Sequence, residues 1–251
     1  MKNTVLKVSL IIGFCSPITA FSDRIISLGA ESFEWVEPSL NLTENGTRYS
    51  VGISAGNFLN KSRGLLHEFS GTVYKGTIDY NGGLQNGDPL KSDTVYSGLK
   101  GEAKLALRGR SFDIAGALGL EKWTREIKSG ISESGTQGIG YTETYTQPYA
   151  KLGIGFFHQT GTGKGRFEVG YKLPFAVQED VDIFEDLTLE PKGADSVYIK
   201  YRYQSGRRWG VAVYSEKTNF KESDLVRAGN GIFKQPDSKS KALGAKVTYR
   251  F

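Results

Sequence analysis

The chain has 251 residues, enough for one or two domains, and its 32 basic and 27 acidic side chains give a net charge of +5. These charges are interspersed, which argues against a nucleic-acid-binding stripe. The mean hydropathy is −0.35 and no segment approaches 18 consecutive apolar residues, so the sequence predicts no transmembrane helix.

The N-terminus has the features of a secretory signal peptide. Lys2 and Lys7 precede the apolar run Val8 to Cys15, and a small residue, Ala20, follows at a suitable cleavage position. We therefore assign residues 1–20 to a signal peptide and residues 21–251 to one mature domain. Cys15 is the only cysteine of the chain, so this division leaves the mature domain without disulfides or thiolate metal ligands.

Ten segments of the mature chain alternate apolar and polar residues with a period of two, which predicts ten β-strands. They cover approximately residues 24–37, 48–57, 66–80, 95–107, 112–125, 145–156, 166–175, 197–203, 209–217 and 241–251. The third segment is ambiguous, because Phe69 and Val73 have one parity whereas Tyr74, Ile78 and Tyr80 have the other. We expect a β-bulge there that brings the apolar side chains to one face.

From the third segment onward, the connections alternate between short turns and long loops. The long loops are residues 81–92, 128–140, 178–194 and 218–236, and the short turns are basic, as with Arg108 and Arg110. An up-and-down meander with turns at one end and loops at the other gives this alternation.

One face of the segments carries charges of both signs: Lys100, Glu102, Lys104, Arg166, Glu168, Lys172, Lys200 and Arg202. In a soluble β-sandwich or lipocalin-like barrel, these side chains would face water and the apolar face would form the core. In a membrane barrel, the apolar face would meet lipid and the charges would pair in the lumen.

Six aromatic residues favour the membrane barrel. They share the apolar parity and lie near a short turn or the C-terminus: Phe112, Phe156, Phe167, Tyr203, Trp209 and Phe251. This placement is typical of a girdle at a membrane interface. We therefore predict an all-β fold, a single up-and-down antiparallel transmembrane β-barrel of about ten strands, or eight if the first hairpin lies outside the wall.

The last segment alternates strictly and ends on Tyr249 and Phe251, with Lys246 where a closing-strand signature would have glycine. Together with the leader and the meander, this ending resembles the small bacterial outer-membrane β-barrels of the opacity and OmpA type. The resemblance implies residence in the bacterial outer membrane, with the termini in the periplasm and the long loops outside the cell. It also implies contact with outer-membrane lipid and lipopolysaccharide, and recognition of the C-terminal strand by the barrel-assembly machinery.

The chemistry of a catalytic or metal site is not evident. The two histidines, His67 and His158, map to the short-turn end, whereas by resemblance an outer-membrane hydrolase would need one near the outer rim. Residues 179–190 hold six acidic side chains that could bind a divalent cation, pair with lysines of the next loop, or remain solvated. We predict no catalytic residue, no metal site, no cofactor and no enzymatic activity.

A barrel of eight to ten strands is nearly filled by its own side chains. We therefore expect a largely filled, charged lumen and a structural or surface-interaction role, with a surface ligand as a further partner and no nucleic acid. A narrow ion or small-solute channel is the alternative, and a rim-located hydrolase is a third.

Overall fold

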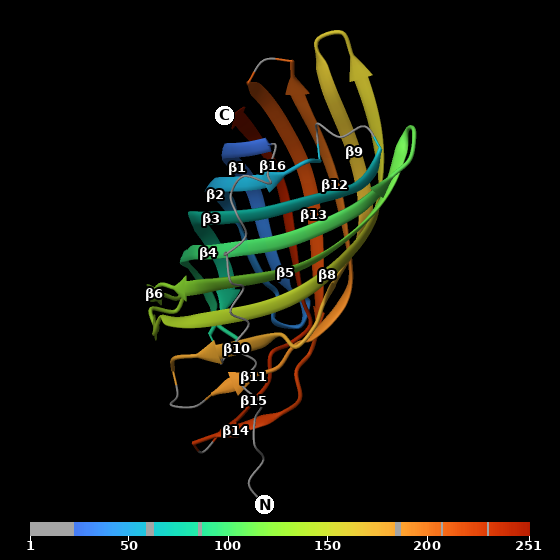
Figure 1. The fold of residues 1–251 in the computed structure, drawn as a ribbon. Coiled ribbons are helices and arrows are strands. Elements are labelled where there is room, and N and C mark those ends of the chain that lie inside the picture. Colours follow the sequence, from blue (N-terminus) through green and yellow to red (C-terminus); the bar gives the residue numbers. More distant parts are fainter. Residues whose placement is uncertain (1–22, 59–62, 85–86, 184–186, 207, 230) are drawn as a thin grey trace, which may run out of the picture.

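The computed structural model describes residues 23–58, 63–84, 87–183, 187–206, 208–229 and 231–251, and the proposed signal peptide lies outside them. Ten antiparallel strands form a closed barrel (Figure 1). They are β1 (Asp23–Glu37), β2 (Leu42–Gly56), β3 (Gly64–Gly83), β4 (Pro89–Arg108), β5 (Phe112–Ile127), β8 (Tyr141–Thr160), β9 (Gly163–Pro174), β12 (Lys192–Ser205), β13 (Trp209–Lys221) and β16 (Ser238–Arg250). The predicted ten-stranded barrel is confirmed, with the first hairpin in the wall.

Pairing of the first strand with the last closes the wall. β1 pairs with β16 from Ile25 opposite Arg250 to Val36 opposite Lys239, and β9 joins β8 to β12. Closure leaves no free sheet edge, as a bilayer requires. Within the described residues, no helix is long and apolar enough to cross a membrane.

The outer surface of the barrel is apolar. Leu105, Ile154 and Ile199 are 56%, 48% and 46% exposed, whereas the preceding Lys104 is only 6% exposed. The outward rows become polar or charged farther along the strands, for example at Lys122 on β5. An apolar outer band around a polar interior is the pattern of an outer-membrane β-barrel, so this prediction is confirmed.

The predicted bulge in the third strand is absent. β3 keeps one continuous register with β4, from Gly64 opposite Arg108 to Gly83 opposite Pro89. Phe69 and Val73 face outward, while Tyr74, Ile78 and Tyr80 lie inside the barrel. β3 is therefore apolar on both faces, because the lumen has its own aromatic core.

This aromatic core lies in the half of the lumen toward the long loops. Its buried members are Phe33, Trp35, Leu42, Tyr74, Ile78, Tyr80, Leu90, Tyr96, Trp123, Ile127, Tyr145, Val177 and Phe220. The rings of Trp123 and Tyr145 stack with centroids 4.7 Å apart. A second, smaller cluster of Phe58, Leu66, Ala106 and Ala115 lies near the short turns.

The described parts of the long loops contain more strand structure than predicted. The connection from β3 to β4 is only residues 84–88, because both strands run on through most of the predicted 81–92 loop. The other long loops form small strands: β6 (Gly130–Ile131), β7 (Gln137–Gly138), β10 (Gln178–Val181), β11 (Thr188–Leu189), β14 (Val226–Ala228) and β15 (Gly231–Phe233). A one-turn 3-10 helix, η2 (Pro38–Leu40), joins β1 to β2.

Two of these small hairpins pack on each other at one end of the barrel. Leu187 and Leu189 beside β10–β11 share an apolar cluster with Ala228 of β14. In Figure 1 these hairpins lie below the barrel, and the C-terminus lies at its opposite end. We call these the loop end and the short-turn end.

Candidate functional site: the charged lumen

The eight predicted lumen charges all belong to inward-facing rows of the wall. Lys104, Arg166, Glu168, Lys172 and Arg202 are buried, and Lys100, Glu102 and Lys200 are half-buried. They come from β4, β9 and β12, so the closed sheet directs side chains from distant parts of the sequence into one space.

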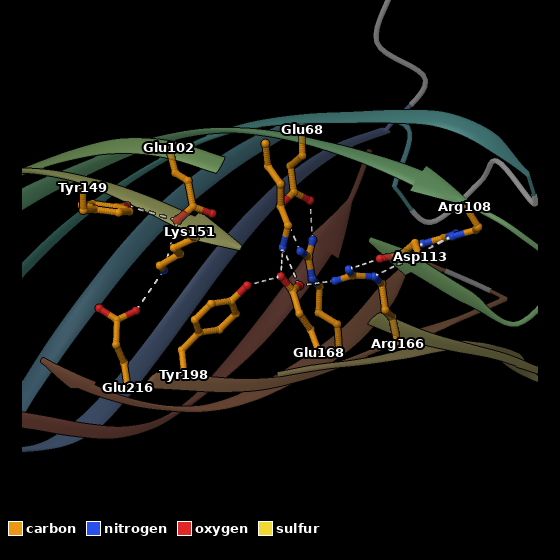
Figure 2. A network of polar contacts seen from close by, with 12 residues as sticks. Glu68, Glu102, Arg108, Asp113, Tyr149, Lys151, Arg166, Glu168, Tyr198 and Glu216 are labelled. Atoms are coloured by element: carbon orange, nitrogen blue, oxygen red, sulfur yellow. Dashed lines mark hydrogen bonds and ion pairs between the residues drawn. The ribbon is translucent and has the colours of Figure 1, made fainter. Parts of the chain in front are cut away.

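Near the short turns, two carboxylates hold three cations. Asp113 accepts hydrogen bonds from Arg108, at 3.1 Å, and from Arg166, while Glu168 accepts from Arg166 and Lys104. Figure 2 shows the two arginines on either side of Asp113. Arg108, predicted to lie in a short turn, is instead the last residue of β4, where it is 2% exposed and lies inside the barrel.

The ion pair between Arg202 and Glu68 spans the lumen. Both terminal nitrogens of Arg202 on β12 donate to the carboxylate of Glu68 on β3, one of them at 2.9 Å. Such a bidentate pair fixes orientation as well as charge.

Farther toward the loop end, one carboxylate serves three lysines. Glu216 of β13 accepts hydrogen bonds from Lys100 at 3.1 Å, Lys151 at 2.9 Å and Lys172 at 2.7 Å. Glu121 lies 3.6 Å from Lys100 and 3.7 Å from Lys172, so it contributes a second negative charge to this group.

Tyrosine hydroxyls complete the coordination of the inward glutamates. The donor–acceptor pairs are Tyr74–Glu121, Tyr96–Glu44, Tyr145–Glu143, Tyr149–Glu102, Tyr198–Glu168 and Tyr214–Glu31. Figure 2 shows two of them, Tyr149 directed toward Glu102 and Tyr198 directed toward Glu168. The phenol supplies a neutral donor, so a buried carboxylate gains a hydrogen bond without adding a charge.

At the loop end, a single arginine faces several carboxylates. Arg125 lies 2.6 Å from Glu143, 3.0 Å from Glu44 and 3.3 Å from Glu37. Glu179 of the β10 hairpin is buried beside this group, and its burial and the nearby Glu143 raise its pKa well above the ordinary value. The acidic excess therefore extends from the wall into the loop hairpin.

This loop-end group and several other lumen residues were not predicted from the sequence. Glu37, Glu44, Arg125 and Glu143 lie near predicted strand ends, where the alternation with apolar residues is weakest. Glu143 has the parity of Tyr145 on β8, and Arg125 that of Trp123 on β5, so longer predicted strands would have placed both inside the barrel.

The predicted interface aromatics lie on the outer face at the short-turn end. Phe112 pairs with Phe156, and Phe156 with Phe167, so three rings form a row across β5, β8 and β9. Trp209 contacts Tyr249 edge-on at 5.0 Å between ring centroids. The remaining two differ in exposure: Tyr203 is half-buried and Phe251 is 55% exposed.

Both histidines lie at the short-turn end, as expected. His158 is near the end of β8, where its ring stacks on Tyr201 and its Nε2 lies 3.2 Å from the phenol oxygen. His67 lies near the start of β3.

Within the acidic segment 179–190, Glu185 and Asp186 lie outside the described residues, and the structure separates several of the others. Glu179 turns into the barrel mouth, while Asp180 accepts a hydrogen bond from Thr188 at 2.6 Å and Asp182 one from the backbone of Thr142 at 2.7 Å. Across the described part of the chain, no three histidine, cysteine or acidic side chains are arranged to hold a metal ion.

Comparison with known proteins identifies no sequence family, since neither a family model nor a curated protein matches the chain. The structure is similar to the outer membrane protease OmpT from Escherichia coli, with 10% identity, coverage of 92% of this chain and 97% of that one, and a TM-score of 0.48. It is also similar to the transport unit of the autotransporter AIDA-I from Escherichia coli, with 9% identity, coverage of 95% of this chain and 94% of that one, and a TM-score of 0.47. A third similar structure is Neisserial surface protein A, with 11% identity, coverage of 91% of this chain and 97% of that one, and a TM-score of 0.38. At these values, none of the likenesses indicates an activity for this chain.

Proposed function

We propose that this outer-membrane β-barrel serves a structural or surface-interaction role, with its loop end outside the cell and its lumen closed to diffusion. The supporting observation is the presence of buried ionic layers at both ends of the lumen. Near the short turns, Asp113 and Glu168 together bind Arg108, Arg166 and Lys104. At the loop end, Arg125 contacts Glu143, Glu44 and Glu37. Moving a solute through either layer would break buried ion pairs, at a cost of several kcal/mol per pair.

The loops supply a surface suited to contact with a partner. Their small hairpins leave aliphatic side chains strongly exposed: Leu40, Ile131, Ile139, Ile183, Leu225 and Ile232. These residues lie in connections between wall strands, beyond the membrane-facing rows, so lipid does not account for their exposure. Exposed apolar groups of this kind favour binding to another macromolecule or to lipopolysaccharide.

We extend the proposal to the absence of enzymatic activity. Neither histidine lies near the loop-end carboxylates, and those carboxylates are occupied by Arg125 and by tyrosine hydroxyls. A rim-located hydrolase would need a base or nucleophile there with an open position.

Conductance in planar bilayers tests the closed lumen. The purified barrel should give no stable conductance steps. Reproducible steps that change when Lys100 or Arg202 is replaced by methionine would contradict the proposal and favour the narrow channel.

A further inference from the structure

The lumen is unevenly filled. Seven short hydroxyl side chains on β1, β2, β3 and β16 face the interior: Ser27, Ser50, Ser54, Ser70, Thr72, Ser240 and Thr248. Opposite these short side chains are the long charged residues of the other strands. The space left between them is a cavity of about 210 Å³. One water molecule needs only roughly 10–15 Å³ on this measure, so the cavity has room for more than an isolated water.

The wall of this cavity is rich in positive charge. Eight cationic and five carboxylate side chains line it, an excess of three positive charges when all are ionised. Most of the cations are paired, but Lys200 on β12 and Lys246 on β16 form no ion pair or hydrogen bond with the described residues. The ammonium group of Lys246 lies over the ring of Tyr214, 5.4 Å from its centroid. Glu31 is the carboxylate that acts most strongly on Lys246. Its oxygens are already bound, one to Nη2 of Arg48 at 2.6 Å and the other to the hydroxyl of Tyr214 at 2.6 Å.

A neutral donor in the same wall also lacks a partner. Gln204 is 4% exposed, and its Nε2 has no acceptor among the described residues. A Cβ atom added to Gly210 would lie 2.7 Å from both Oε1 of Gln204 and Oγ1 of Thr248, so the amide oxygen lies toward β13. A buried donor without an acceptor is destabilising, and a ligand with acceptor atoms would supply the missing partner.

Lys200 and Gln204 flank Arg202 on the inward-facing row of β12, and the register of the wall places Lys246 beside that row. Arg202 pairs with Ala212, which pairs with Lys246, and Gln204 pairs with Gly210, which pairs with Thr248. Because β13 contributes only a methyl group and a glycine between the long side chains of β12 and β16, space remains between them. The lining also reaches Gln204 and Thr248, one and two residues from the short-turn ends of their strands.

We propose that this region of the lumen binds a compact oxyanion, of the class of inorganic phosphate or sulfate, between Lys200, Lys246 and Gln204. Two ammonium groups and an amide nitrogen are donors only, so they complement a ligand with several acceptor oxygens. The hydroxyls opposite can donate to the oxygens that remain. The anion offsets the excess positive charge of the wall, and this site is independent of the surface role proposed above.

Calorimetric titration of the detergent-solubilised barrel with sodium phosphate, and separately with sodium sulfate, at constant ionic strength tests the site. We expect saturable binding to the unmodified protein. Lys200→Met and Lys246→Met should each weaken it about tenfold or more, because each removes one charge-assisted contact. Lys241→Met is the matched control: Lys241 lies on the same strand, β16, but faces outward and is exposed, so binding should be unchanged.

Folding of each variant is checked by its gel mobility with and without boiling. Without the anion, Lys246→Met should be at least as stable as the unmodified protein, because it removes an unpaired charge from the lumen. Anion-dependent stabilisation should appear in the unmodified barrel and in Lys241→Met only. Absence of saturable heat at roughly 10 mM anion, or equal binding by the Lys200→Met/Lys246→Met double variant, would overturn the assignment.

Discussion

Arg202 and Glu68 lie 134 positions apart in the sequence and form a bidentate ion pair across the lumen. Arg202 belongs to β12 and Glu68 to β3, strands that are not neighbours in the wall. Their contact therefore depends on closure of the whole barrel. The pair connects the charged residues of β12 to the side of the barrel that carries the small hydroxyl residues.

Arg202→Met should lower the free energy of unfolding by about 3–5 kcal/mol, because it leaves the buried carboxylate of Glu68 without its partner. The double variant Arg202→Met/Glu68→Gln should recover much of that loss, because no uncompensated charge then remains. Urea unfolding in lipid vesicles measures both. Equal destabilisation by the single and double variants would show that the pair is not coupled.

A charge placed on the outer face should reveal the membrane band. Leu118 is 64% exposed near the middle of the outward row of β5, and Leu118→Arg should destabilise the barrel by about 2–4 kcal/mol. Thr124→Arg, on the same face of the same strand but beyond Lys122, should cost about 0–1 kcal/mol, because it lies near or past the interface. Unfolding in vesicles compares them. Similar losses for both variants would exclude a lipid boundary between these positions.

The β10–β11 hairpin should bind more weakly to the barrel mouth as pH rises. Burial raises the pKa of Glu179, and Glu143 and Glu37 raise it further, so the docked hairpin favours the neutral acid. The stabilisation is complete below the ordinary pKa of 4.5 and is lost as pH rises through the raised value. Hydrogen exchange of the hairpin amides, corrected for intrinsic rates, should show protection that falls over this range. Glu179→Gln should remove the dependence, and an unchanged slope in that variant would assign it elsewhere.

Phe58 should anchor the connection between β2 and β3 inside the short-turn end. Its ring is 2% exposed, packs with Leu66 and Ala106, and lies 4.9 Å from the guanidinium of Arg166. Phe58→Ala should lower stability by about 3–5 kcal/mol, and Phe58→Leu by less, because leucine fills more of the space. Thermal unfolding compares the two; equal and small losses would show that the ring is not part of the lumen core.

The strand count and the faces of the wall could be predicted because alternation is a local property. The rows of Leu105 and Ile154 keep their period over most of each strand, and the inward charges on β4, β9 and β12 follow directly from it. Strand β3, which is apolar on both faces, could not be predicted in this way. Apolar side chains inside a barrel, such as Ile78, cannot be distinguished in the sequence from those that face lipid.

The partners within the lumen could not be predicted either. Arg125 meets Glu44 from 81 positions away, and Glu216 collects lysines from β4, β8 and β9. Such contacts depend on which strands face each other after closure. The cavity beside Lys246 also forms only when the barrel closes, because the small residues that leave the space come from four different strands.

Spin-label accessibility in lipid vesicles tests most directly whether the apolar face meets lipid. Single cysteines replace Leu105, Ile154 and Ile199 on the outward rows and, as matched inward positions, Ala106 and Ala115. Labels at the first three should relax strongly with lipid-soluble oxygen and weakly with a polar nickel complex, while labels at the two alanines should be shielded from oxygen. Shielding of Leu105, Ile154 and Ile199 from oxygen in a correctly folded barrel would contradict the arrangement of apolar residues outside and charged residues inside, on which the closed lumen depends.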